Sequence, residues 1–348
     1  MPRKTAIFKD PLFMEHDPGY GHPESPDRLR VIFEMLAQPE QQDRYLLPAC
    51  KPATDDILAL NHTKSHIARV AATDGKTFSI LDPDTHTSAK SHAAARLAAG
   101  AVVEATRMVT AGEADNAFAL VRPPGHHAES DHTSGFCLFN NIAIAAGYAI
   151  KHLGLTRILI VDWDLHHGNG TQHSFYDTDQ VLYFSTHQYP YFPGTGRVGE
   201  TGSGKGEGHT INVPLPGGQD DLAYARIFND LLVPVARAYK PELILVSAGF
   251  DISFGDPLGL MTVTSDGFAY LTGVLQGLAD ELCHGRLVLA LEGGYDLEGL
   301  RAGTAAVLRE LRDGDGLPAQ KRKALGKASP VLIALEQAIV TAKKYWPV

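Results

Sequence analysis

Short apolar segments rich in Val, Ile and Leu alternate along the chain with longer stretches in which hydrophobic residues recur at helical spacing. An early helix is predicted to end near Leu36, with Ser25 as its N-cap and Pro26 at its first position. Strands are predicted at about residues 116–121, 157–161, 180–185, 242–248 and 286–291, and helices at about 91–109, 140–152, 222–239, 266–284 and 298–312. Because strands that alternate with helices build a parallel sheet covered on both faces, the pattern predicts an α/β fold.

Polar clusters follow four of these apolar segments, at the point where each segment ends. They contain His126 and His127, then Asp162, Asp164 and His166, then Asp251, and finally Tyr295. In an extended chain, residues two apart share a face, so Asp164 and His166 can face the same ion. Open parallel sheets bind ligands at the carboxyl ends of their strands, and we therefore expect the four clusters in a single crevice.

Length and composition indicate an ordinary soluble globular protein, with 348 residues, 44% of them hydrophobic and 20% charged. A division by about 150 residues per domain would suggest two domains, but α/β folds often exceed that length in one unit. No linker separates the polar clusters, so a single domain over residues 1–348 is expected.

Charge and cysteine content exclude several classes of partner. The formal net charge is −9 and the only basic run is at residues 321–323, which argues against nucleic-acid binding. Three widely separated cysteines argue against a disulfide framework. The chain shows neither a signal-peptide pattern nor the ~20 apolar residues of a membrane span, so a cytoplasmic protein without a membrane partner is expected. A homo-oligomer is compatible with the sequence.

Three of the strand-end residues are of the types that zinc accepts, namely Asp164, His166 and Asp251. A catalytic zinc commonly takes three protein ligands and a water. Each residue alone has a structural alternative, because Asp caps helices and His fills polar cores. Their placement at the ends of neighbouring strands favours a metal site.

With these motifs in view, the sequence resembles the histone deacetylase superfamily, which includes bacterial deacetylase-like amidohydrolases and acetylpolyamine amidohydrolases. The matching stretches are residues 22–29, 122–128, 135–141, 161–170, 192–196, 247–251 and 292–295. The resemblance implies an arginase-like α/β fold around an eight-stranded parallel sheet with helices on both faces. Asn169, together with the Arg-Pro-Pro-Gly before the histidine pair, is similar to the class II branch.

The resemblance also assigns roles to the clustered residues. Zinc would be held by Asp164, His166 and Asp251, and Tyr295 would donate to the substrate carbonyl. His126 and His127 would flank the water, with His127 as the general base. Asp162 would orient His126, and Asn169 would orient His127. Since an amide cannot offset imidazolium charge, His127 is expected to lose its proton readily. A potassium ion is implied beneath the zinc, near Asp162, Asp164, His166, Ser185 and Thr186.

A narrow substrate tunnel follows from the same resemblance. Its walls would be Phe136, next to Gly135, and Phe192, which together would admit a slender alkyl chain such as acetylated lysine. Asp82 or Asp84 would supply a carboxylate at the rim, although an exposed turn aspartate explains either residue equally well.

The chemistry of the neighbouring positions separates the competing functions. A ureohydrolase would need extra carboxylates for a second metal ion at positions occupied by Gly168 and Ser253, so amide deacylation is favoured. An acetylpolyamine deacetylase would be expected to carry Glu near Leu258, which favours acyl-lysine and leaves polyamine as the alternative. A non-catalytic protein that binds acylated ligands is disfavoured, because such a protein could lose Tyr295 or one histidine.

One glycine-rich segment imitates a phosphate-binding loop at residues 199–205, but Gly206 stands where Ser or Thr would be needed to bind magnesium. Residues 199–208 are instead expected to form a surface loop near the mouth of the pocket.

Overall fold

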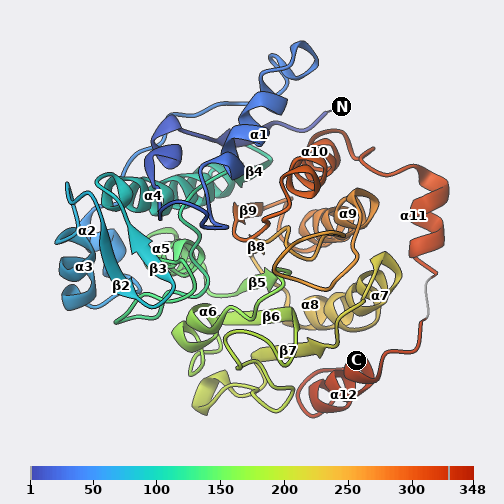
Figure 1. Cartoon of the computed structure of the whole chain (residues 1–348). Coiled ribbons are helices and arrows are strands. Elements are labelled where there is room, and N and C mark those ends of the chain that lie inside the picture. The colour runs from blue at the N-terminus through green and yellow to red at the C-terminus, as the bar shows by residue number, and fades with distance from the viewer. Residues whose placement is uncertain (1, 328–329) are drawn as a thin grey trace.

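Seven parallel strands form the central sheet of the computed structural model, which describes residues 2–327 and 330–348 (Figure 1). The strand order is β1-β4-β9-β8-β5-β6-β7, and every neighbouring pair is parallel. The strands are β1 (Thr5–Phe8), β4 (Asn116–Ala119), β5 (Ile158–Asp162), β6 (Val181–Gln188), β7 (Thr210–Leu215), β8 (Leu243–Ala248) and β9 (Leu287–Leu291). The predicted α/β fold is confirmed, but the described residues supply seven strands to this sheet rather than eight. The only other strands described, β2 (Ser79–Asp82) and β3 (Thr85–Thr87), form a separate antiparallel hairpin.

Helices cover both faces of the sheet, as the alternation of elements predicts (Figure 1). One face carries α4 (Ser91–Thr110), α5 (Asn141–Leu153) and α6 (Asn169–Ser174). The other carries α7 (Asp221–Ile227), α8 (Val233–Tyr239), α9 (Ser265–Leu282) and α10 (Leu297–Asp313). The remaining helices are α1 (Asp27–Leu36), α2 (Asp55–Leu58), α3 (Lys64–Ala71), α11 (Ala319–Leu325) and α12 (Ile333–Ala342), with short turns η1 (Pro11–Glu15), η2 (Pro39–Gln41), η3 (Gly204–Gly206) and η4 (Phe228–Leu232).

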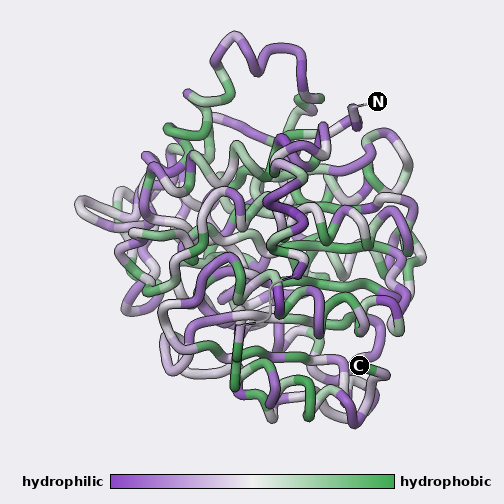
Figure 2. The backbone as a smooth tube through the Cα atoms, turned by 90° about the vertical axis from the view of Figure 1, so that its right-hand side faces the viewer, coloured by the Kyte–Doolittle hydropathy of each residue, from purple (hydrophilic) through white to green (hydrophobic). Residues whose placement is uncertain are grey.

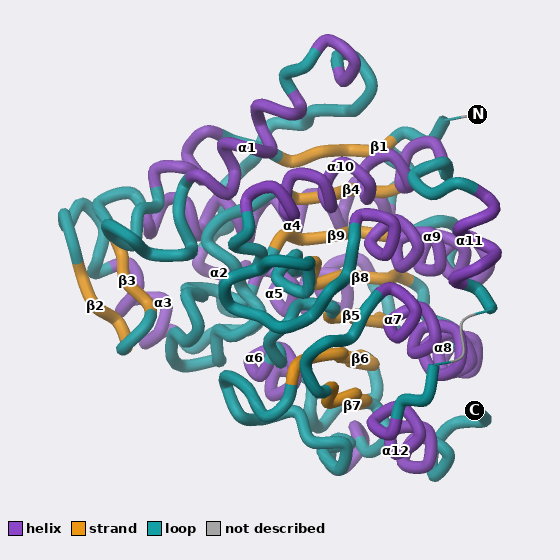
Figure 3. Tube along the Cα trace, turned by 45° about the vertical axis from the view of Figure 1, so that its right-hand side comes forward, coloured by secondary structure: helices purple, strands orange, loops and turns teal. Residues whose placement is uncertain are grey.

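The hydrophobic core lies between these layers. Every residue of β4, β5, β8 and β9 is buried, because helices exclude water from both faces of a parallel sheet. Figure 2 shows the hydrophobic stretches of the chain running through the middle of the molecule, where the strands lie. Figure 3 shows the strands stacked between the helices. Because every neighbouring pair is parallel, the carboxyl ends of the strands meet on one side of the sheet. Among the described residues, no helix combines the length and apolar character needed to cross a bilayer.

Local structure departs from the sequence prediction at two helices. The first helix, α1, has Pro26 rather than Ser25 at its N-cap, and no side chain caps it. The prediction for Ser25 was wrong by one residue: Pro26 stands at the N-cap with dihedrals that are already helical (φ −55°, ψ −26°), and its ring carries no acceptor for a capping hydrogen bond. The predicted helix over 222–239 is interrupted by the π-helical turn η4, immediately before a proline in the first turn of α8 that has no N–H to donate.

The glycine-rich segment at residues 199–208 does not lie where the sequence suggested. Thr201 and Gly208 line a small crevice together with Thr341 and Tyr345, which lie in or just after α12. A side chain at position 208 would meet the Tyr345 ring at 2.6 Å, so glycine is needed for this packing. The segment contacts the C-terminal helix and contributes no residue to the pocket described next.

Candidate active site

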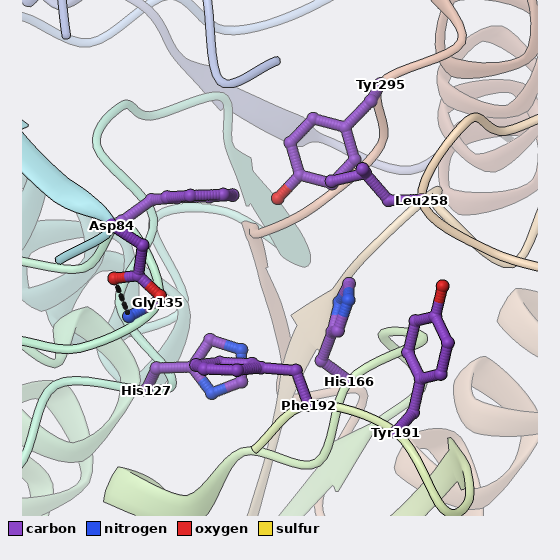
Figure 4. Close-up of a pocket in the computed structure, with 9 residues that line it drawn as sticks. Asp84, His127, Gly135, His166, Tyr191, Phe192, Leu258 and Tyr295 are labelled. Atoms are coloured by element: carbon purple, nitrogen blue, oxygen red, sulfur yellow. Dashed lines mark hydrogen bonds between the residues drawn. The ribbon is translucent and has the colours of Figure 1, made fainter. Parts of the chain in front are cut away.

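One cavity of about 340 Å³ opens at the carboxyl ends of the central strands (Figure 4). It is lined by Asp84, His127, Gly135, Phe136, His166, Tyr191, Phe192, Leu258 and Tyr295. Figure 4 shows Tyr295 and Leu258 on one side of the cavity, with His127, His166, Phe192 and Tyr191 on the other. The loops after the predicted strands therefore meet in one crevice.

Three predicted metal ligands lie together, and one of them, His166, lines the cavity. Ligand atoms of Asp164, His166 and Asp251 all lie within 4.8 Å of one another, and the three residues are buried. The imidazole Nδ1 of His166 lies 3.0 Å from a carboxylate oxygen of Asp251 and 3.3 Å from one of Asp164. Two buried carboxylates and an imidazole at this spacing fit a divalent cation such as zinc.

Two glycines allow the backbone to pack closely against these carboxylates. A Cβ at Gly249 would lie 2.1 Å from Asp164 Oδ2, and one at Gly293 would lie 2.4 Å from Asp251 Oδ2. The backbone N–H of Gly293 also donates to Asp164 Oδ2 at 2.8 Å. Both glycines are therefore required by close approach to the candidate ligands rather than by turn geometry.

The electrostatics of the trio favour a bound cation. Burial, and then the negative charge of Asp164, raises the pKa of Asp251 to about 7. Burial alone would lower the pKa of His166, but its hydrogen bonds with Asp164 and Asp251 raise it to about 9. A divalent ion would offset the negative charge of the two buried carboxylates.

The positions considered for a second metal ion carry no carboxylate. A Cβ at Gly168 would lie 2.3 Å from Asp162 Oδ2, so a carboxylate could not replace this glycine without displacing Asp162. Ser253 is buried, and its hydroxyl has no hydrogen-bond partner among the described residues.

The histidine pair lies beside the trio, and the two rings are separated by 4.0 Å between centroids. His126 Nδ1 lies 3.0 Å from Asp162 Oδ2, which also accepts a hydrogen bond from the Tyr183 hydroxyl. His127 Nδ1 lies 2.7 Å from Asn169 Oδ1. Each histidine thus has its Nδ1 held by the partner that the sequence suggested.

The two histidines are shifted in opposite directions. Burial disfavours the charged form of His126, but the negative charges of Asp164 and Asp162 raise its pKa to about 10. Burial, and then the positive charge of His126, holds the pKa of His127 well below its usual value. The lowered pKa of His127 was expected from its amide partner, yet its largest cause is burial, and the hydrogen bond to Asn169 acts in the opposite direction.

Tyr295 is held in the cavity wall by contacts to its backbone and ring. Asp256 accepts hydrogen bonds from the N–H groups of Tyr295 at 2.7 Å and Asp296 at 3.0 Å. The Arg28 guanidinium lies 5.0 Å from the centroid of the Tyr295 ring and donates to the carbonyl oxygen of Gly294 at 2.6 Å. The segment that carries Tyr295 is therefore held by both Asp256 and Arg28.

Arg28 belongs to a buried charge cluster that sequence reasoning missed. Glu24 accepts hydrogen bonds from Arg28 at 2.8 Å and from Arg122 at 2.5 and 2.8 Å, and all three side chains are fully buried. The residues lie within stretches that carry the family resemblance, but no local pattern indicates that they contact one another. Glu292 was missed for the same reason; its carboxylate accepts the N–H groups of Gly125 and His126 and so holds the histidine loop.

The cavity walls include the predicted aromatic side chains. Phe192 packs edge-on against His127 with 5.1 Å between centroids, and Phe136 packs edge-on against Tyr295 at 6.1 Å. A Cβ at Gly135 would lie 2.3 Å from the His127 ring, so this position must be glycine. Leu258 lines the cavity and places no charge there.

The two rim aspartates differ in position. Asp84 lines the cavity, and its carboxylate accepts the N–H of Gly135 at 3.1 Å. Asp82 is turned to Thr133, whose hydroxyl donates to it. Asp84 is therefore the better placed of the two candidates for contact with a substrate.

Of the residues expected around a monovalent cation, Ser185 and Thr186 lie on β6, next to β5. Ser185 pairs in register with Asp162 across β5 and β6, and its hydroxyl is 2.9 Å from His187 Nδ1. The hydroxyl of Thr186 is buried and has no hydrogen-bond partner in the described part of the chain.

Comparisons with known proteins agree with this geometry. A family model described as the histone deacetylase domain matches residues 22–311. The chain is 40% identical over 365 residues to histone deacetylase 18 of Arabidopsis thaliana, and the alignment covers 99% of this chain but only 52% of the plant protein. It is 41% identical over 298 residues to a protein of Archaeoglobus fulgidus named "Probable deacetylase", with 85% of this chain and 82% of that one covered. Among solved structures, the HD domain of HDA15 superposes with a TM-score of 0.90 at 38% identity, over 99% of this chain and 96% of that chain.

Proposed function

Because the chain belongs to the histone deacetylase family, we propose that it is a zinc-dependent amidohydrolase that removes acetyl or related acyl groups from the ε-amine of lysine. The observation that carries the proposal is the convergence of a buried Asp-His-Asp trio, two oriented histidines and Tyr295 around one cavity. No single residue of this set would be enough to indicate the function. Together they supply every group that metal-assisted amide hydrolysis needs.

Zinc would be held by Asp164, His166 and Asp251, whose ligand atoms have the spacing and charge that it requires. When bound, zinc acts as a Lewis acid that polarises the amide carbonyl and lowers the pKa of a water toward about 7.

His127 is the general base of the proposed mechanism. Its Nδ1 is bonded to the Asn169 carbonyl oxygen, which leaves Nε2 with a free lone pair. Burial keeps the ring neutral at physiological pH, since its pKa lies well below the usual value. His127 can therefore accept the proton of the attacking water and deliver it to the leaving amine.

The other residues orient the reactants. Asp162 fixes His126 through Nδ1, which leaves Nε2 3.7 Å from Asp164 and available to hold the water. The Tyr295 hydroxyl would donate to the carbonyl oxygen as negative charge develops on it. Burial holds the pKa of Tyr295 well above its usual value, so this hydroxyl keeps its proton.

An acylated lysine side chain is the substrate that we favour. Phe136, Phe192 and Leu258 give the channel apolar walls that suit an alkyl chain. An acetylated polyamine is the second candidate, favoured by the Asp84 carboxylate in the cavity wall, which could pair with a second ammonium. A potassium ion near Asp162, Ser185 and Thr186 is also proposed, supported by the unpaired buried hydroxyl of Thr186.

A rate comparison tests the proposal. The zinc-loaded protein should hydrolyse acetyl-lysine peptides faster than acetylspermidine or acetylputrescine, as judged by kcat/KM for each substrate. Faster turnover of the polyamines would overturn the preference for lysine. Absence of turnover on all three would refute the deacylase assignment.

A further inference from the structure

The side-chain amide of Asn169, in the first turn of α6, is held between a histidine and a carboxylate. Its Oδ1 lies 2.7 Å from His127 Nδ1, and its Nδ2 donates to Glu129 Oε1 at 2.5 Å. Asn169 is 7% exposed and Glu129 is 9% exposed, so water does not compete freely for these bonds. The far side of the His127 ring is thus connected through one amide to a negative charge.

The Glu129 carboxylate decides which way the amide faces. An ionised carboxylate only accepts hydrogen bonds, so it must take the NH₂ end of Asn169. The carbonyl end of the amide then faces His127. An amide oxygen only accepts hydrogen bonds, so the ring nitrogen opposite it must carry a proton. His127 must therefore carry its proton on Nδ1, which leaves the Nε2 lone pair directed away from Asn169.

Glu129 is itself held in place from several directions. Its backbone N–H donates to the His132 carbonyl at 3.0 Å, and its own carbonyl oxygen lies 2.9 Å from His62 Nδ1. On the solvent side, His173 Nδ1 lies 2.9 Å from the same Oε1 that receives the Asn169 amide. A hydrogen bond to Glu129 is also the largest cause of a raised pKa at His173.

We propose that Glu129 is a positioning residue for the reaction, which acts through the Asn169 amide to fix the tautomer and orientation of His127. This inference rests on the proposed function, because it gives Glu129 a purpose only if His127 serves as the base. Asn169 carries no charge, but the carboxylate of Glu129 lies directly behind it, so that His127, Asn169 and Glu129 form a hydrogen-bonded chain, here called the His127–Asn169–Glu129 series.

A double-mutant cycle tests the series, because the carboxylate and the amide can be exchanged between positions 169 and 129. In Asn169→Asp, two carboxylates would face each other where an amide now donates at 2.5 Å, and their repulsion should displace the partner of His127. Adding Glu129→Gln restores a donor opposite the introduced carboxylate, which still accepts from His127. We expect Asn169→Asp alone to lower kcat about tenfold or more, and the double variant to recover to within about threefold of the wild type. KM and zinc content should stay nearly constant throughout.

Glu129→Ala provides a second route if Asn169→Asp does not fold. Without the carboxylate the amide can rotate, so kcat should fall about tenfold at unchanged KM, whereas Glu129→Gln keeps an acceptor and should lose only a few-fold. Glu310→Gln is the matched control: Glu310 is a buried carboxylate of α10, paired with Arg322 and remote from the cavity, and its loss should leave kcat unchanged.

The outcomes separate the two proposals. If the effects of the two substitutions on kcat were strictly additive, or if Glu129→Ala kept full kcat, the positioning role would be overturned. Turnover by the wild type would still support the deacylase function in that case. A wild-type protein that hydrolyses no acylated amine would overturn both.

Discussion

Neutralising Glu24 is expected to destabilise the protein more than any surface substitution. Its carboxylate is fully buried, and it is paired at once with Arg28, with Arg122 and, at 3.2 Å, with His16 Nε2. Glu24→Gln keeps the size and shape of the side chain but leaves two buried guanidinium groups without a counter-charge. The substitution therefore isolates the electrostatic contribution of the cluster.

The expected magnitude follows from this burial. Removing one partner of a buried ion pair costs about 3–5 kcal/mol, because the remaining charge stays desolvated. Glutamine can still accept one hydrogen bond, which places the expected loss near the lower end, at about 3 kcal/mol. Because Arg28 also donates to the Gly294 carbonyl beside Tyr295, turnover should fall together with stability.

The loss should depend on pH in a defined direction. Burial alone would raise the pKa of Glu24, but the charge of Arg122 and hydrogen bonds from His16 and Arg122 hold it well below 4.5. A carboxyl whose folded pKa is depressed stabilises the fold above its unfolded pKa, and this contribution is lost as the pH falls through the folded value. The difference between the wild type and Glu24→Gln should therefore be full at pH 7 and shrink once the pH falls below about 4.5.

Urea unfolding of the zinc-loaded proteins measures this difference. Glu298→Gln is the matched control, because Glu298 is 71% exposed on its side chain and pairs with Arg301 at the surface of α10. Surface substitutions of this kind usually change the free energy of unfolding by less than about 0.5 kcal/mol. Equal losses for Glu24→Gln and Glu298→Gln would refute the reasoning, as would a loss that grows on acidification.

Three further predictions concern the site. Asp251→Asn should abolish tight zinc binding without unfolding the chain, which metal analysis after dialysis together with circular dichroism would reveal; retained zinc would contradict the ligand assignment. Gly249→Ala should weaken zinc binding, because its Cβ would lie 2.1 Å from Asp164 Oδ2, and a normal zinc affinity by competition with a chelator would count against this packing. Asp256→Asn should lower kcat about tenfold with little change in zinc content, since it weakens the two backbone bonds that hold Tyr295; steady-state kinetics showing full kcat would argue that this loop needs no such support.

Local pattern was sufficient to predict the strand ends and the residues that follow them. Asp164 and His166 lie two residues apart after an apolar strand, and neighbouring parallel strands bring Asp251 to the same edge. Alternation of elements likewise predicted the α/β fold, because each strand and its following helix are recognisable within a short window.

Contacts between distant segments could not be predicted in the same way. Arg28 and Gly294 are 266 residues apart, and Glu129 and Asn169 are 40 apart, so no spacing rule connects either pair. Ser25 was misassigned because a Ser-Pro pair marks the start of a helix only to within about a residue, and the structure places Pro26 at the N-cap. The segment at 199–208 was misplaced because its packing against the chain end depends on residues more than a hundred positions away.

The most direct test of the account is a zinc titration of the metal-free protein, followed by its hydrolysis of an acetyl-lysine peptide. A single Asp-His-Asp trio predicts that turnover rises linearly and reaches its plateau at one zinc ion per chain. Turnover that persists without metal, or a plateau that requires two ions per chain, would contradict a one-metal amide hydrolase.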